Sequence, residues 1–226
     1  MIDMDHLPPL SDVVLFSKAE AVRNYADMPF EPKIESYMAD YIVQRVADAV
    51  AAEPYGDKFT LKRMGEMDVP DRLTLFEYGI INSSLAHNTN SGAVLISQGR
   101  TQAVGINDKE HIDVITRLSG SQIPRCTALT FELIDALEKD SYMAFDDGLG
   151  YLTSSPDMLG TGLRCRLLVH LPGLEQAKKI DSVKRGLEEY DVRLDALSIP
   201  MAGKVNSLNA AVACGIIVFE AVKGRK

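Results

Sequence analysis

The sequence predicts an α+β fold in which an antiparallel sheet is flanked by helices. Residues 93–97 and 102–106 are two short apolar runs around a turn at 98–100, which is typical of a β-hairpin. Residues 34–52 repeat apolar side chains with a helical period, and further helical patterns follow downstream. Strand pairs mixed with long amphipathic helices favour an antiparallel sheet backed by helices.

The remaining elements are predicted from the periodicity of apolar residues and from the proline and capping residues at their ends. The helix at 34–52 has Pro32 before it and Pro54 after it, as helix boundaries often do. Residues 71–78 fit a strand or a helix equally well. The polar, turn-rich stretch 82–92 is expected to be a mobile surface loop. Further helices are expected at 127–139, 176–190 and 208–221, the last capped by Ser207, and a short strand at 192–196.

A strand at 163–171 follows the glycine turn 160–162 and carries the most informative pattern. Side chains alternate along a strand, so Arg164, Arg166 and His170 share one face, and the other face is apolar. A cationic face beside a glycine turn suits an anionic ligand. It also suits an antiparallel strand with one face in solvent, and the spacing alone leaves both open.

Composition excludes several classes of function. The chain has 226 residues, enough for one domain or one domain with an appendage. Its formal net charge of −8 argues against a nucleic-acid partner. No apolar run is long enough to cross a membrane and no leader is recognisable, so no membrane partner and a cytoplasmic location are expected. Cys126, Cys165 and Cys214 are expected to be reduced core residues, and no metal site is predicted.

The segment YLTSSPDMLGTGLR, residues 151–164, closely resembles the YLTSCP-x-N-x-GTGLR segment of the ATP:guanidino phosphotransferases, above all the bacterial protein-arginine kinases. Four other segments resemble family elements in the family's order: VVLFSKAEAVRN, FTLKRMGEMDVPDRLTLFEYGIINSSLA, INDKEHIDVI and YMAFDDGLGYLTSSP. The resemblance implies a guanidino-kinase-like catalytic domain at 1–174, incomplete at its C-terminus. Residues 175–226 would be a helix and an atypical tail. A sheet that lost its last part could expose an edge strand, so a homo-oligomer is possible.

In that family arginines clamp the ATP phosphates, a carboxylate pair orients the guanidinium and a cysteine lies beside it. Mg-ATP would be the cofactor of an active enzyme, and a protein arginine its substrate. The resemblance places Lys18, His111 and Arg164 on the nucleotide, Asp108 and Glu110 in catalysis, and Glu77 and Ser155, the latter in place of the cysteine, on the substrate side.

Three positions depart from the family in charge. Glu20 and Asp113 stand where the resemblance implies arginines, and Lys109 stands where it implies the acid that acts as base. The family's later RG-x-x-GEG loop and ISN segment are not found, whereas Arg23 is kept and is expected to be structural. Opposite unit charges about 4 Å apart interact by roughly 4 kcal/mol at an effective dielectric near 20. Two reversals could therefore cancel micromolar binding, worth about 8 kcal/mol.

The sequence thus predicts a protein-arginine kinase-like domain that is catalytically impaired, a pseudokinase. One alternative is a non-catalytic module that binds an active kinase, its activator or a protease-chaperone. A further alternative is an RNA methyltransferase fragment, because the tail resembles the last motif of SpoU-type (SPOUT) enzymes. The family's earlier motifs are not found, and that resemblance rests on Ile199, Pro200, Met201, Gly203, Ser207, Leu208 and Asn209.

Overall fold

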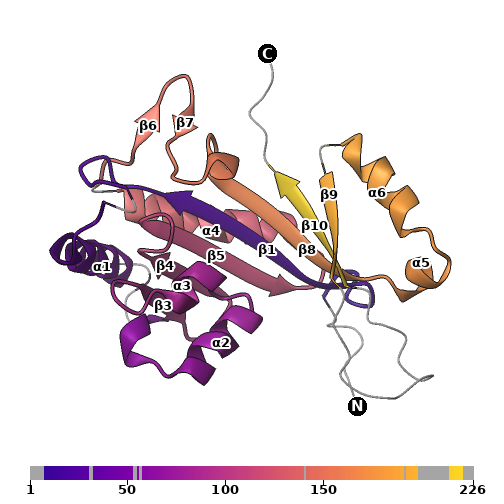
Figure 1. The fold of residues 1–226 in the computed structure, drawn as a ribbon, viewed down its shortest axis with the longest axis horizontal. Helices are drawn as coiled ribbons and strands as arrows, with labels where there is room; N and C mark the ends of the chain where they lie inside the picture. The colour runs from indigo at the N-terminus through magenta and orange to yellow at the C-terminus, as the bar shows by residue number, and fades with distance from the viewer. Residues whose placement is uncertain are drawn as a thin grey trace.

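A computed structural model describes residues 8–30, 33–52, 55, 58–139, 141–190, 192–197 and 214–220. Its centre is one eight-stranded sheet with the strand order β2-β3-β4-β5-β1-β8-β10-β9, in which every pair of neighbours is antiparallel. A separate hairpin, β6–β7, stands away from the sheet (Figure 1). The strands are β1 (Val14–Arg23), β2 (Phe59–Arg63), β3 (Ala93–Ser97), β4 (Gln102–Ile106), β5 (Ile112–Ser119), β6 (Phe145–Asp146), β7 (Gly150–Tyr151), β8 (Leu163–His170), β9 (Val192–Leu197) and β10 (Cys214–Glu220).

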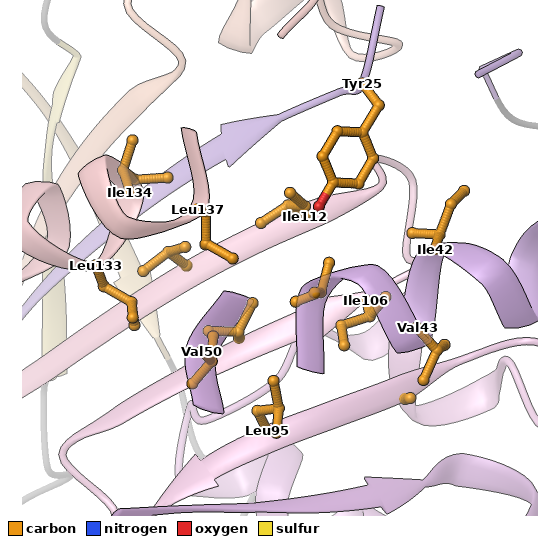
Figure 2. Close-up of a cluster of buried hydrophobic side chains, with 14 of the residues drawn as sticks. Tyr25, Ile42, Val43, Val50, Leu95, Ile106, Ile112, Leu133, Ile134 and Leu137 are labelled. Carbon is orange, nitrogen blue, oxygen red and sulfur yellow. The ribbon is translucent and has the colours of Figure 1, made fainter. Parts of the chain in front are cut away.

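Helices cover the sheet on both faces. One face packs against α1 and α4, and their shared core includes Val46, Leu95, Ile112 and Leu133 (Figure 2). A second core, around Met64 and Leu85, packs α2 and α3 on β3 and β4. The helices are α1 (Ser36–Ala51), α2 (Val69–Glu77), α3 (Ser83–His87), α4 (Ile123–Glu138), α5 (Pro172–Gln176) and α6 (Ile180–Glu188), with single 3₁₀ turns η3 (Met64–Glu66) and η4 (Pro156–Met158).

Strand β1 is the central element of the site. It pairs with β5 on one side and with β8 on the other, and its register sets Lys18 opposite Arg166 and Glu20 opposite Arg164. Residues directly opposite in an antiparallel pair project to the same face. The pairing therefore gathers charged side chains from two strands on one face of the sheet.

Several elements agree with the sequence predictions. The hairpin strands 93–97 and 102–106 are β3 and β4, and the helix predicted at 34–52 is α1. The helix predicted at 127–139 is α4, which starts earlier because a proline occupies its first turn. The ambiguous stretch 71–78 lies mostly in α2, where the Asp68 side chain accepts a hydrogen bond from the Asp71 amide.

Three expectations were wrong in part. The helix expected at 176–190 is broken into α5 and α6, because Lys178 takes a positive φ of 53°. The expected loop at 82–92 contains α3, with Leu85 and Ala86 buried. The helix expected at 208–221 is a strand over Cys214–Glu220, where a run of β-branched and aromatic residues pairs with both β8 and β9.

Strands β9 and β10 follow the predicted boundary at residue 174, yet they belong to the same sheet as β1 and β8. The division into two parts stays a prediction, and the SpoU-like residues 199–209 lie outside the described residues.

Candidate functional site

A cleft of about 520 Å³ opens on the charged face of the sheet, and we call it the site cleft. Strands β1, β5 and β8, the start of α3, the β4–β5 turn and η4 all contribute to it. The described residues that line it are Glu20, Val22, Asn82, Ser83, Ser84, Asp108, Lys109, Glu110, Asp113, Ser155, Asp157, Met158, Arg164 and Arg166.

Glu20 lies at the centre of the site cleft and forms ion pairs with two cationic side chains. Its side chain is almost fully buried, and its Oε2 lies 2.8 Å from Arg166 Nη1 and 3.6 Å from Lys18 Nζ. Asn82 Nδ2 donates to its Oε1 at 3.0 Å. Burial alone would raise the pKa of Glu20, but Lys18, Arg166 and Asn82 together lower it to about 2. Glu20 is therefore a fixed anion that pairs with two neighbouring cations and offsets one of their two positive charges.

Asp113 lies beside Glu20 and shares its amide partner. Asn82 Nδ2 donates to Asp113 Oδ2 at 2.6 Å, and Asp113 Oδ1 is buried without a hydrogen-bond partner among the described residues. Burial, reinforced by the charge of Glu20, raises the pKa of Asp113 well above its ordinary value. Asn82 thus bridges two carboxyl groups that would otherwise repel one another.

Arg164, the arginine kept from the family motif, is engaged by Asp157 of η4. This hydrogen bond lowers the pKa of the Asp157 carboxyl, against the effect of its partial burial. The cation that the sequence places on a nucleotide is therefore ion-paired in the structure.

The carboxylate of Glu110 accepts hydrogen bonds that hold neighbouring segments of the fold together. Glu110 is buried, and its carboxylate accepts from Asn24 Nδ2 at 2.6 Å, from the Ser154 amide at 2.8 Å and from the Ser155 amide at 2.9 Å. These bonds tie the loop before η4 to β1 and to the β4–β5 turn. Asp108 is only half-buried in the site cleft, and burial raises its pKa.

His111 lies in the core and does not line the site cleft. Its Nδ1 accepts from the Tyr25 amide at 3.0 Å, and its Nε2 lies 3.0 Å from the Pro29 carbonyl. Burial lowers its pKa and so favours the neutral imidazole, although the hydrogen bond with the Pro29 carbonyl acts in the opposite direction. Glu77 is exposed at the end of α2 and does not line the site cleft either.

Arg23 is a structural residue, as the sequence predicts. Its Nε lies 2.7 Å from Glu138 Oε1, its guanidinium lies 3.4 Å above the centre of the Tyr151 ring, and it donates to the Thr161 carbonyl at 3.2 Å. It therefore fixes the glycine turn before β8 against α4.

Of the seven predicted site residues, the structure brings four into the site cleft: Asp108, Glu110, Ser155 and Arg164. Lys18 does not line the site cleft, but its Nζ lies 3.6 Å from Oε2 of Glu20, which does. The sequence reasoning missed Asn82 and Asp157. Asn82 stood in a stretch predicted to be a loop, and Asp157 stood within the family motif, where its charge beside the kept arginine was the available signal.

The side chains present do not fit a triphosphate. Five carboxyl groups line the site cleft against three cations, and Arg164 and Arg166 are already paired with carboxylates. A polyanion needs unpaired donors, since each carboxylate nearby repels it. Within the described part of the chain, no group of three or more His, Cys, Asp or Glu residues is placed to hold a metal ion.

The fold and the site face define a guanidino-kinase-type catalytic domain, and comparisons with known proteins agree. The family model described as ATP:guanido phosphotransferase, C-terminal catalytic domain, matches residues 41–200. The chain belongs to this ATP:guanidino phosphotransferase family.

Its relatives by sequence include protein-arginine kinases. That of Geobacillus stearothermophilus is 34% identical over 177 residues, covering 77% of this chain and 49% of the relative. That of Clostridium tetani is 32% identical over 184 residues, covering 81% of this chain and 54% of the relative. The chain thus spans about half the length of the curated relatives it matches.

Solved structures share the fold at lower identity. The duplicated taurocyamine kinase from Schistosoma mansoni with bound transition state analog components superposes with a TM-score of 0.78 at 18% identity, covering 93% of this chain and 30% of that chain. Lombricine kinase superposes with a TM-score of 0.70 at 16% identity, covering 98% of this chain and 64% of that chain. Among the described residues, none of the helices has the length and apolar composition that a membrane crossing requires.

Proposed function

We propose that this chain is a protein-arginine kinase-like domain that has lost phosphoryl transfer and does not bind Mg-ATP in the manner of its family. The observation that carries the proposal is the buried Glu20 carboxylate, which lies against both Lys18 and Arg166. Phosphoryl transfer depends almost entirely on positioning and on neutralising phosphate charge. Two cations that share a buried carboxylate attract a phosphate less strongly than the same cations without it.

Two further observations support the loss of activity. Arg164 is paired with Asp157, and Lys109 stands where the family resemblance implies a general base. Glu110, one of the two candidate acids, has its carboxylate engaged by three donors. A base must be free to accept a proton from its substrate, and neither Lys109 nor Glu110 meets that need. Asp108, the other candidate acid, remains in the site cleft with its pKa raised by burial.

The test is an arginine-phosphorylation assay with the full chain. Casein and Mg-ATP are incubated with the protein, and acid-labile phosphoarginine is measured beside an active protein-arginine kinase as positive control. We expect no phosphoarginine above background. Phosphoarginine that accumulates with the wild type, and disappears in Arg164→Ala, would contradict the proposal.

A charge-restoring variant sharpens the test. Glu20→Arg combined with Asp113→Arg returns the two reversed positions to the residues that the family resemblance implies. If charge is what prevents nucleotide binding, a folded double variant should gain Mg-ATP affinity over the wild type. Glu20→Gln with Asp113→Asn is the matched control, because it removes the anions without adding cations.

A second candidate is a module that binds a protein partner. The β6–β7 hairpin projects from the sheet (Figure 1). Phe145 and Leu149 on it, and Tyr142 just before it, are at least half exposed. Such a group of exposed apolar side chains is typical of an interaction surface. An active protein-arginine kinase is the partner to test, by analytical ultracentrifugation of the mixture. Equal sedimentation of the wild type and a Phe145→Ser variant would count against this candidate.

A further inference from the structure

Three acidic side chains of the site cleft lie around Asn82, and we call Glu20, Asp108 and Asp113 the carboxyl cluster. The negative charges of Glu20 and Asp108 both act on Asp113. The cations that act on it are Lys18 and Arg166, and both already form ion pairs with Glu20. The carboxyl cluster thus has one carboxyl group more than the cations that face it.

The carboxyl cluster also has acceptor atoms that no donor reaches. Asp113 is 3% exposed, and its Oδ1 has no hydrogen-bond partner in the described part of the chain, whereas its Oδ2 accepts from Asn82. Asp108 Oδ1 is buried without a partner in the same way. Buried polar atoms are normally hydrogen-bonded. Two residues that line one cleft therefore each lack a donor that a ligand could bring.

Without a ligand, a proton offsets the excess negative charge. Burial and the charge of Glu20 raise the pKa of Asp113 well above its ordinary value, and burial raises that of Asp108. The side chains that act on Asp113 come from β1 (Lys18, Glu20), from β8 (Arg166), from the β4–β5 turn (Asp108) and from the residue before α3 (Asn82). A cation bound in the site cleft would do what the proton does, so it should displace that proton.

The lining of the site cleft indicates which cation fits. Among the described residues, no group of acidic, histidine or cysteine side chains is placed to hold a metal ion, so an organic cation is the better match. A guanidinium is best held by a carboxylate with both oxygens free for its fork, whereas Asp113 has only Oδ1 free. A compact ammonium needs only single acceptors. The hydroxyl groups of Ser83 and Ser84 supply further acceptors.

Apolar side chains in the same lining can contact an aliphatic stem. Val22 and Met158 both line the site cleft, whose volume of about 520 Å³ is many times that of a water molecule. We propose that the site cleft binds a primary alkylammonium group at the carboxyl cluster, with its stem against Val22 and Met158. This inference rests on the proposed function, because Mg-ATP in the site cleft would occupy the same space.

The first experiment is isothermal titration calorimetry of the full chain with butylammonium chloride at low salt and pH 8. The matched probe is 1-butanol, which has the same stem without the charge. We expect butylammonium to bind and 1-butanol to bind at least tenfold more weakly, because only the ammonium offsets the carboxyl cluster. No binding of butylammonium, or equal binding of the two probes, would overturn the inference.

Proton release distinguishes the carboxyl cluster from any other acidic surface. The titration is repeated in phosphate and in HEPES, which differ in their enthalpy of ionisation. We expect the observed heat to change with the buffer, because the ammonium favours the ionised form of Asp113 and displaces its proton. For the same reason, binding should be tighter at pH 8 than at pH 6. Binding that releases no proton would contradict the inference.

Two variants locate the site. Asp113→Asn keeps an acceptor for Asn82 and removes the titrating group, so it should abolish proton release and weaken butylammonium roughly tenfold at pH 8. Asp108→Asn should also weaken binding. Asp147→Asn is the matched control, an exposed aspartate outside the site cleft, and should bind as the wild type does. Wild-type affinity in both cleft variants would overturn the inference.

Two further ligands complete the experiment. Nα-acetyl-lysine methylamide carries the same ammonium and stem as butylammonium, so its binding would point to a lysine side chain as the source, and binding of butylammonium alone to a free amine. Either result supports the inference. Mg-ATP is titrated in parallel. If neither Mg-ATP nor an ammonium binds, this inference fails and the proposed function stands, whereas tight binding of Mg-ATP contradicts the proposed function itself.

Discussion

At the scale of single residues, Glu20 shows how a reversed charge is accommodated in a buried strand. An arginine implied by the family would lie beside Arg166 of β8 and Lys18 of its own strand, whereas Glu20 pairs with both. Buried ion pairs add little net stability, but removing one partner is costly because the other charge stays buried. The cluster is therefore self-consistent as it stands, and it carries one net positive charge where an arginine at position 20 would give three.

The first residue-scale prediction concerns Glu20→Gln. At pH 7 this change should lower the free energy of unfolding by about 3 kcal/mol, because Lys18 and Arg166 lose their buried anion. The pKa of Glu20 is lowered to about 2, so its contribution is present above the ordinary carboxyl pKa and is lost as the pH falls through about 2. Urea unfolding at pH 7 and pH 2 checks both points. The exposed Glu175→Gln is the control, and an unchanged stability of Glu20→Gln at pH 7 would contradict the account.

A second prediction is that Asp113→Asn raises the free energy of unfolding, whereas Glu20→Gln lowers it. Because the pKa of Asp113 is raised, its protonated form is the stable one in the fold, and the wild type loses stability as the pH rises through that raised pKa. The asparagine removes the buried charge and still accepts from Asn82. We expect a gain of about 1–2 kcal/mol in urea unfolding at pH 8, and almost none at pH 3. Exposed Asp147→Asn serves as the control, and a loss of stability at pH 8 would refute the assignment.

Residue patterns revealed part of the site. The alternation in β8 predicted that Arg164 and Arg166 share a face, and the structure confirms it. The partner of Arg166 depends on the register between β1 and β8, a pairing of residues more than 140 positions apart that no local pattern encodes. The hydrogen bonds of Asn82 with Glu20 and Asp113 could not be predicted either, because they form only when α3 packs on the sheet.

At the scale of elements, the glycine turn before β8 is sterically constrained. Gly162 has a φ of +63°, and a Cβ atom there would lie 2.7 Å from both Arg23 Nη1 and the Val22 carbonyl oxygen. The turn accepts only glycine because the buried Arg23 side chain and the β1 backbone fill the space beside it. This turn fixes the point at which β8 begins, and therefore the position of Arg164 along the sheet.

Gly162→Ala should therefore destabilise the protein by about 2–3 kcal/mol, through backbone strain and overpacking. Gly173→Ala is the matched control, because a Cβ atom there would meet nothing within 4 Å and the φ of Gly173 is ordinary. That control should change stability by less than about 0.5 kcal/mol. Urea unfolding of both variants decides the matter, and equal effects would show that the turn is not constrained.

Strand β1 and strand β10 show why local patterns fail for some elements. β1 is buried along most of its length on both faces and carries Lys18, Glu20 and Arg23, so it lacks the alternation of a half-exposed strand. β10 lies within the helix expected at 208–221, an expectation that rests on Ser207 as its cap. Its partners β8 and β9 decide its conformation.

Hydrogen exchange tests the place of β10. Its backbone pairs with β8 on one side and β9 on the other, so amides of Cys214–Glu220 should exchange as slowly as those of β8. The amides of the exposed turn at 98–100 provide the fast reference. Exchange in β10 as fast as in that turn would mean that the sheet ends at β8.

At the scale of the whole molecule, the family's sheet is kept and its charges are rearranged. The sequence predicted the fold class and the hairpin, because periods and turns are local, and the family resemblance carried the rest. The Glu20–Arg166 ion pair joins two strands that are distant in sequence, so the sequence alone could show that the charge at position 20 was reversed but not that it pairs with Arg166.

The measurement that tests the central claim most directly is a calorimetric titration of the folded full chain with Mg-ATP at low salt, where a charged site is least screened. A Kd weaker than about 1 mM, worth about 4 kcal/mol, is the result expected if Glu20 and Asp157 neutralise the cations of the site cleft. A Kd of about 10 µM or tighter that is lost in Arg164→Ala would contradict the account and restore this chain to the active kinases.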